Sequence, residues 1–376
     1  MIYFDSAATT KPYKEALETF NKLNDELFAN PASSHLFGSK ANTYLEKARN
    51  QISSLLGLND RFNLYFTSGA TESNNQAILG YCRRHKKEGN KVITSSLEHP
   101  SVTNAFKELE KEGFEAIYLN SSKEGTISLN ELENALDNKT IFVSIMGVNN
   151  EVGSIFPYRE IYKLVHSKSK AVFMSDLTQM IGKEKVDFNY IDMFSMSSHK
   201  VGGLKSLGLL GVVKGINIDQ IIYGGEQEGG FRPGTVNMPL ACSLATALRI
   251  NLSSLDERRK RAKEINDYLR SKLDNNPLFE IASPLGGTPF ILNIILKHTK
   301  ASVLVEALSK REVYVSTRSA CSSHSEGGSS VILNMGYSEF DSKNAIRMSF
   351  NGLEQKGVEQ EFIKIFFEEI GKIKSI

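Results

Sequence analysis

The sequence predicts an α/β fold in which a large domain with a mainly parallel sheet is joined to a smaller α+β domain. Between residues 64 and 213, short apolar runs alternate with segments of helical periodicity, the pattern of a parallel sheet covered by helices on both faces. The last hundred residues mix strand-like and helical segments. The chain has 376 residues, more than a typical single domain, so a second domain is expected.

Each element follows from its own pattern. Helical periodicity marks residues 12–28 and 39–57, and in the second segment Ala41, Leu45, Ala48, Ile52 and Leu55 form one apolar stripe. Apolar runs predict strands at 64–66, 92–94, 116–119, 141–146, 171–174 and 207–213. Residues 239–273 are expected to form helices that lead to the smaller domain. There, strands are predicted at 290–296 and 313–315, and helices at 301–308 and 360–373.

Charge and hydropathy exclude several classes of protein. The net charge is +2, which offers no electrostatic basis for direct nucleic-acid binding. The basic run 258–261 lies in a helical segment and is predicted to coat its solvent face. No apolar stretch approaches the roughly 18 residues of a membrane span, and residues 1–4 do not have the basic start of a signal peptide. We therefore expect a cytoplasmic protein that does not enter a membrane.

The three cysteines differ in their surroundings. An odd count argues against a disulfide framework, and the spacings do not fit a zinc site, so no metal is expected. Cys82 and Cys242 lie in apolar helical segments and are predicted to be inert. Cys321 lies in a small, polar segment, where a thiol would be accessible and where Arg318 and His324 could lower its pKa. An incidental loop cysteine is the alternative.

A lysine and an acid suggest covalent cofactor chemistry. Lys200 ends the segment Ser197-Ser198-His199-Lys200, and a lysine whose amine is activated by burial can form a Schiff base with an aldehyde. Asp176 ends an apolar run, so it is expected at the carboxyl end of a strand, where α/β proteins bind ligands. Taken alone, Lys200 fits a solvated surface lysine better, and Asp176 fits a turn or cap residue better.

Three further turns follow predicted strands. Ala70 and Thr71 lie at a helix start after small hydroxyl residues, which is typical of a phosphate site, although an ordinary N-cap at Ser68 or Thr71 is the alternative. His99, in Glu98-His99-Pro100-Ser101, could stack on a flat cofactor or simply cap a helix. An asparagine in the turn at 149–150 could contact such a ring or make an Asx turn.

With these motifs, the chain resembles the cysteine desulfurases of the NifS/IscS type over essentially its whole length. These proteins are fold-type I pyridoxal phosphate enzymes. The matching segments are YFDSAATT at 3–10, NPASSH at 30–35, TSGATESNN at 67–75, EHPS at 98–101, NNEVG at 149–153, Asp176 with Gln179, SSHK at 197–200, FRPGTVN at 231–237, SACS at 319–322 and Arg347 within AIRMS. The resemblance implies a large cofactor-binding domain with a seven-stranded sheet at 12–255. It implies a small α+β domain at 1–11 and 256–376 that carries the cysteine segment at about 316–330.

The resemblance also implies roles for individual residues. Lys200, Cys321 and His99 would be catalytic, with the cofactor bound to Lys200 and His99 stacked on its ring. The other expected cofactor contacts are Ala70, Thr71, Ser197, Ser198 and His199 at the phosphate end, Asn150 at the ring, Asp176 at the pyridinium nitrogen and Gln179 at the phenolic oxygen. Arg347 and Asn30 would bind the substrate. Thr235 would reach the phosphate of a neighbouring subunit, which implies a homodimer with shared active sites.

The implied reaction converts L-cysteine to L-alanine and leaves the sulfur as a persulfide on Cys321. An acceptor protein would then take the sulfur for iron–sulfur cluster assembly or tRNA thiolation. The sequence departs from the family pattern at Ser198, at 202–206, at Glu226 and at Arg318. A selenocysteine lyase, an aminotransferase or decarboxylase that does not need Cys321, and a catalytically quiet scaffold that binds a sulfur acceptor are the alternatives.

Overall fold

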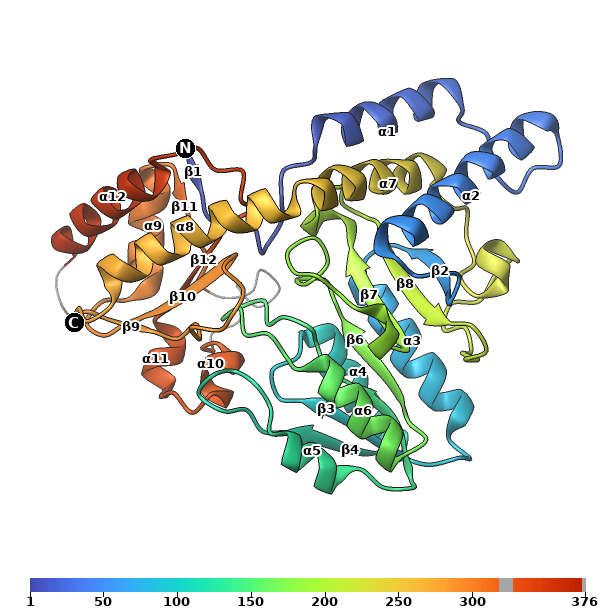
Figure 1. The fold of residues 1–376 in the computed structure, drawn as a ribbon, viewed down its shortest axis with the longest axis horizontal. Helices are drawn as coiled ribbons and strands as arrows, with labels where there is room; N and C mark the ends of the chain where they lie inside the picture. The colour runs from blue at the N-terminus through green and yellow to red at the C-terminus, as the bar shows by residue number, and fades with distance from the viewer. Residues whose placement is uncertain (318–326, 374–376) are drawn as a thin grey trace.

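The computed structural model describes residues 1–317 and 327–373. It has two lobes, and the larger contains a seven-stranded sheet in the order β2-β8-β7-β6-β5-β3-β4 (Figure 1). Its strands are β2 (Phe62–Thr67), β3 (Lys91–Ser95), β4 (Glu115–Leu119), β5 (Thr140–Ser144), β6 (Val172–Asp176), β7 (Met193–Ser197) and β8 (Gly208–Val213). In this sheet β8 runs antiparallel to both of its neighbours, β2 and β7, and the other four pairs are parallel. The mainly parallel sheet and the α/β fold class are therefore confirmed.

Strand β7 is absent from the strands predicted by apolar runs. Its sequence, Met193-Phe194-Ser195-Met196-Ser197, alternates apolar residues with serines, yet the strand is fully buried. The serine hydroxyls are accommodated because they have partners: Ser195 Oγ donates to Asn74 Oδ1 at 2.5 Å, and Ser197 Oγ accepts from Ala70 N at 3.0 Å. The serines interrupt the apolar pattern, and for this reason the sequence did not predict β7 as a strand.

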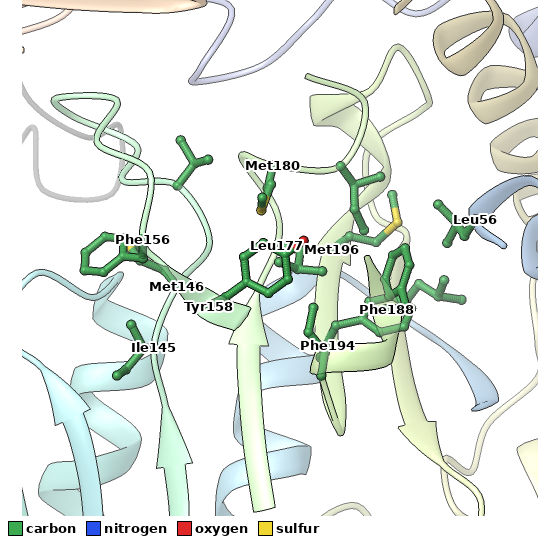
Figure 2. Packing of buried hydrophobic residues seen from close by; sticks show 14 of the residues in the cluster. Leu56, Ile145, Met146, Phe156, Tyr158, Leu177, Met180, Phe188, Phe194 and Met196 are labelled. Atoms are coloured by element: carbon green, nitrogen blue, oxygen red, sulfur yellow. The ribbon is translucent and has the colours of Figure 1, made fainter. Parts of the chain in front are cut away.

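Helices cover both faces of the sheet because alternate side chains on the buried strands point to opposite faces. Phe142 and Met174 belong to a core formed with α3 (Ala70–His85) and α4 (Pro100–Lys111). Val143 and Phe173 belong to the core on the other side, to which α2 (Leu36–Leu56), α5 (Leu129–Ala135), α6 (Tyr158–Lys168) and α7 (Met238–Ser253) contribute. Helix α1 (Lys14–Glu26) packs on α7. Figure 2 shows part of the second core, with Ile145 and Leu177 just beyond the ends of β5 and β6.

The apolar stripe predicted for residues 39–57 is largely as expected. Ala41, Leu45, Ala48 and Ile52 are buried in α2, but Leu56 is buried at its last turn and Leu55 is only half-buried. The helix ends at Gly57, which has φ +68° and takes the left-handed conformation that favours glycine. Through this stripe, α2 packs against the sheet and against α7.

The smaller lobe has its own core. β10 (Ile291–Leu296) pairs antiparallel with β9 (Phe279–Ile281) and β12 (Ala345–Ser349), while β1 (Ile2–Tyr3) pairs parallel with β11 (Val313–Tyr314). Their apolar side chains pack with those of α8 (Leu255–Leu273), α9 (Ala301–Lys310) and α12 (Val358–Lys372). The short helices α10 (Ser330–Asn334) and α11 (Glu339–Lys343) lie near the larger lobe (Figure 1). The exact division of the chain into 12–255 and the remainder stays a prediction.

The prediction that residues 258–261 coat a solvent face was wrong for Arg258, which is 3% exposed. Its guanidinium donates to the carbonyl oxygens of Gly182 and Asn351 and to Asn251, so the charge is buried with hydrogen-bond partners. Burial lowers the pKa of Arg258 below its ordinary value. Among the described residues, no helix combines the length and apolar character needed to cross a membrane.

Candidate active site

The predicted site residues converge at the carboxyl ends of the parallel strands. Together with Ala7, Ala8, Met146, Val148 and Thr178, they line a cavity of about 230 Å³. The predicted residues in this lining are Ala70, Thr71, His99, Asn150, Asp176, Gln179, Ser197, His199, Lys200 and Arg347. A crevice at this edge of the sheet is where α/β proteins bind ligands.

Lys200 lies in the short 3₁₀ turn η2 (Ser198–Lys200) directly after β7. Its Nζ donates to the carbonyl oxygens of Ala7 and Ala8, at 2.5 and 2.7 Å. These two backbone acceptors were missed by reasoning from the sequence, because alanine side chains carry no chemistry. The N-terminal YFDSAATT segment thus forms one wall of the site and orients the lysine amine.

Asp176 is held rigidly at the end of β6. Its Oδ2 accepts from Asn74 Nδ2 at 2.8 Å, and its Oδ1 accepts from the backbone N–H of Thr178 at 2.9 Å. Asn74 in turn donates to Ser101 Oγ at 2.8 Å. Since Asp176, Asn74 and Ser101 are buried, the network fixes the carboxylate at the cavity wall.

The turn that was predicted to bind a phosphate lies at the N-terminus of α3. The N-cap is Gly69 and no side chain caps it, so the capping alternative for Ser68 or Thr71 was wrong. Gly208 at the start of β8 approaches so closely that a Cβ there would lie 2.4 Å from the Gly69 backbone. A second cavity, of about 380 Å³, continues from the first around this turn and adds Lys205. N–H groups at a helix N-terminus beside a lysine favour an anion.

Two histidines face the cavity with lowered pKa values. His99 caps α4 through Nδ1, which accepts from Ser101 N at 3.2 Å, so it makes the predicted cap and also lines the cavity. Burial, together with the charge of Lys200, lowers its pKa below the ordinary value. Burial lowers the pKa of His199 to about 4, and Lys200 contributes to the shift. His199 is therefore neutral at pH 7.

Arg347 reaches the cavity from β12 of the smaller lobe. It is 1% exposed, its Nη1 donates to the Asn150 carbonyl oxygen at 2.9 Å, and its Nη2 pairs with Asp5 at 2.7 Å. Among the described residues, its Nε has no hydrogen-bond partner. A guanidinium held in this way can bind a carboxylate through two parallel hydrogen bonds.

Three predicted residues lie away from the cavity lining. Ser198 is buried but does not line the cavity, and Thr235 is exposed on the surface of the chain. Asn30 was predicted to bind substrate, but within the chain it does not join the cavity; it lies in the loop between α1 and α2, where its Oδ1 accepts from Ala32 N at 2.9 Å. This local turn explains the difference, because the side chain serves its own loop. Cys321 lies outside the described residues.

Asn30 lines a different and larger cavity, of about 600 Å³, between α2 and residues 226–229. Two of its charges neutralise each other: Arg49 pairs with Glu228 at 2.7 Å, and Glu228 also accepts from Phe66 N at 2.9 Å. The smaller cavity, in contrast, gathers a lysine, an arginine, two histidines and an acid. It is the better candidate for catalysis.

The other two cysteines were expected to be inert. Cys82 is fully buried in α3, and burial raises its thiol pKa well above the ordinary value. Cys242 is half-buried in α7, and burial raises its pKa to about 11. A thiol with a raised pKa is a poor nucleophile, so both cysteines are unreactive, as predicted.

The site suits pyridoxal phosphate. It supplies a lysine, a buried carboxylate for a ring nitrogen, and a helix N-terminus for a phosphate. Thr178 and Arg347 line the cavity, and among the described residues Thr178 Oγ1 and Arg347 Nε are buried without a hydrogen-bond partner. Unpaired buried polar atoms are costly, so their presence here is consistent with a polar ligand.

Comparison with known proteins agrees with this geometry. The family model described as Aminotransferase class-V matches residues 2–359. A NifS/IcsS protein homolog from Lactobacillus delbrueckii subsp. bulgaricus is 38% identical, with 98% of this chain and 97% of that protein covered. Cysteine desulfurase IscS 1 from Archaeoglobus fulgidus is 35% identical over 89% of this chain and 88% of its own. The solved structure titled NIFS-LIKE PROTEIN superposes with a TM-score of 0.93 at 32% identity, covering 99% of each chain.

The fold and the site together define a pyridoxal phosphate enzyme of fold type I. The chain belongs to the class-V aminotransferase family and, within it, to the NifS/IscS group that the sequence motifs indicated.

Proposed function

We propose that this protein is a cysteine desulfurase that uses pyridoxal phosphate to convert L-cysteine to L-alanine and transfers the sulfur to an acceptor protein. One observation carries the proposal: Lys200, Asp176 and Arg347 converge on one cavity from β7, β6 and β12. These residues supply an amine, a fixed carboxylate and a guanidinium, which are the groups required to hold the cofactor and an amino-acid substrate. The names of the relatives support the same substrate class.

Pyridoxal phosphate, when bound, supplies an electron sink for negative charge at the substrate Cα. The residues of the chain do the rest. Asp176 holds a proton at the ring nitrogen, Gln179 and His99 orient the ring, and Ala70, Thr71, Ser197 and His199 hold the phosphate. Lys200 would hold the cofactor and would act as the base that removes the Cα proton of the substrate. Arg347 binds the substrate carboxylate, which replaces part of its pairing with Asp5.

Sulfur transfer needs a second nucleophile, and we assign it to Cys321. Its thiolate attacks the substrate sulfur, so that an S–S bond forms while the C–S bond breaks. The electron pair of the broken bond stays with the three-carbon fragment, which is protonated and released as alanine. The described ends of the cysteine segment support this assignment. Ser316 makes two backbone hydrogen bonds with Arg347, and Ser329 Oγ donates to Glu151 Oε2 at 2.5 Å, next to Asn150.

The proposal includes a homodimer. Thr235 is exposed within residues 231–237, and this segment is fixed to the chain because Arg232 pairs with Glu72 at 2.8 Å. A rigid segment that presents a hydroxyl outward suits contact with the phosphate of a neighbouring subunit. We further propose a cytoplasmic location and an acceptor that serves iron–sulfur cluster assembly or tRNA thiolation.

Product analysis tests the proposal. Purified protein reconstituted with pyridoxal phosphate is incubated with L-cysteine, and alanine and sulfide are measured. We expect equal amounts of both in the presence of a reductant, loss of both in Lys200→Ala, and unchanged activity in the control Cys242→Ser. Formation of a keto acid in place of sulfide would favour an aminotransferase. A strong preference for selenocysteine over cysteine would favour a selenocysteine lyase, and failure to bind the cofactor would leave a scaffold.

A further inference from the structure

The segment after Asp176 places a second lysine beside the cofactor site. Residues 177–184 form consecutive tight turns, with Ile181 N bonded to the Leu177 carbonyl and Glu184 N to that of Met180. The chain then bends at Gly182, where φ is +78° and a Cβ would lie 2.3 Å from Asn251 Oδ1. This geometry turns Lys183 inward, and the side chain is 3% exposed.

Lys183 contacts Gln179, four residues earlier. Its Nζ donates to Gln179 Oε1, while Gln179 Nε2 donates to the Ala7 carbonyl oxygen at 2.9 Å. The same carbonyl accepts from Lys200 Nζ. The amide nitrogen of Gln179 is therefore on the side of Lys200, and its oxygen is on the side of Lys183.

The reverse orientation of the Gln179 amide is unfavourable only because Lys183 is present. A flipped amide would point its NH₂ group at the lysine donor and its oxygen at the Ala7 carbonyl, losing both hydrogen bonds. Without Lys183, one of these two conflicts disappears. A cofactor phenolic oxygen beside Lys200 needs an N–H donor, so the orientation of this amide decides whether Gln179 can bind it.

The charges around Lys183 fit a donor rather than an ion-pair partner. Lys200, Arg258 and Arg347 surround it, and Glu184 is the acid that acts on it. Burial, reinforced by these cations, holds the pKa of Lys183 well below the ordinary lysine value. An amine that has lost its proton retains N–H groups and can still donate to Gln179.

We propose that Lys183 is a positioning residue, which fixes the Gln179 amide so that its nitrogen faces the phenolic oxygen of the cofactor. The inference rests on the proposed function of the site, since it assumes that pyridoxal phosphate binds at Lys200. It adds to that function a residue that does not line the main cavity.

The test uses the holoenzyme and reads the cofactor directly. A donor to the phenolic oxygen favours its ionised form, so losing the donor raises the pH midpoint of the visible absorption band of the bound cofactor. We expect Lys183→Met to raise this midpoint by about half a pH unit to one unit, within the range for loss of a hydrogen bond to a charged group. Cofactor affinity should fall by about threefold to tenfold. Lys183→Gln, which can still donate, should stay within about twofold of the wild-type affinity.

A double-mutant cycle separates positioning from a direct charge effect. In a Gln179→Leu background, Lys183→Met should cause no further shift in the pH midpoint. A shift as large as in the wild-type background, an unchanged midpoint in Lys183→Met, or a Lys183→Gln variant as defective as Lys183→Met would each overturn the inference. Thermal midpoints verify folding, and Lys183→Leu replaces Lys183→Met if the latter does not fold. If wild-type protein binds no cofactor, the proposed function fails instead.

Discussion

Ser206 has φ +63°, a backbone conformation that L-residues rarely adopt. It lies in the exposed turn between Lys200 and β8, within the segment 202–206 where the sequence departs from the glycine-rich family pattern. We predict that Ser206→Gly raises the free energy of unfolding by about 0.5–1 kcal/mol, because relief of the left-handed strain exceeds the added entropy of the unfolded chain. Urea denaturation measures the change. Ser206→Ala is the control, and a glycine variant no more stable than the alanine variant would refute the prediction.

His199 makes stability depend on pH. Its pKa is lowered from 6.5 to about 4 in the folded chain, first by burial and then by neighbouring lysines. Between these values the unfolded chain binds a proton that the native state does not, so the free energy of unfolding falls as the pH falls from 6.5 to 4. We expect His199→Asn to flatten this part of the profile in the cofactor-free protein. An unchanged slope in the variant would show that other groups cause it.

Individual residues also show where sequence reasoning ended. The chemistry of Lys200, Asp176 and Arg347 could be predicted from motifs, because each carries a group that the reaction needs. The burial of Lys183 and Arg258 could not be predicted, because lysine and arginine usually lie at the surface. Both are buried here because of partners elsewhere in the fold. Lys183 follows Gln179 by four residues, and this spacing is the sequence signal that could have suggested a contact between the two side chains.

At the scale of elements, α10 joins the end of the cysteine segment to the site. Ser329 caps this helix by accepting from Ile332 N at 3.1 Å and donates to Glu151 at 2.5 Å. We predict that Ser329→Ala lowers the free energy of unfolding by about 2 kcal/mol, because it removes a cap and a hydrogen bond to a carboxylate. The same substitution should also lower the rate of persulfide formation, with a smaller effect on cofactor affinity. Ser330→Ala, at an exposed position of the same helix, should have neither effect.

The elements were predicted where apolar periodicity is strong. The apolar runs of β3, β6 and β8, and the stripe on α2, correspond to residues that are buried on one or both faces of the element. Strand β7 was missed because its serines are paired with Asn74 and Ala70, groups 121 and 127 residues away in the sequence. Such pairing depends on the whole fold and leaves no periodic signal within the strand.

At the scale of the whole molecule, Thr235 distinguishes a monomer from an assembly with shared sites. It is exposed, so Thr235→Ala should change the unfolding free energy of the chain by no more than about 0.5 kcal/mol. If it binds the phosphate of a neighbouring subunit, the cofactor dissociation constant should rise by about tenfold or more. Urea denaturation measures the unfolding free energy, cofactor titration measures the dissociation constant, and sedimentation equilibrium measures the oligomeric state. Thr43→Ala is the exposed-threonine control, and unchanged affinity in a dimeric Thr235→Ala protein would remove this residue from the site.

Asn30 and Arg347 show which features of the whole molecule the sequence motifs could and could not predict. Asn30 was assigned to the substrate site from the NPASSH motif, yet within the chain it lines the cavity between α2 and residues 226–229. The motif identified the family correctly but carried no information on which cavity its asparagine would enter. The assignment of Lys200 to the large domain and of Arg347 to the small one was, in contrast, implied by the resemblance to the family.

The most direct test of the central claim is the mass of the peptide that contains Cys321 after the holoenzyme has reacted with L-cysteine without reductant. The account predicts that this peptide gains one sulfur atom while one alanine is released for each sulfur bound. In Lys200→Ala the peptide should keep its mass, and in Cys321→Ser alanine release should fall to background. Alanine formed at the wild-type rate by Cys321→Ser, or with Cys321 unmodified in the wild type, would contradict the account.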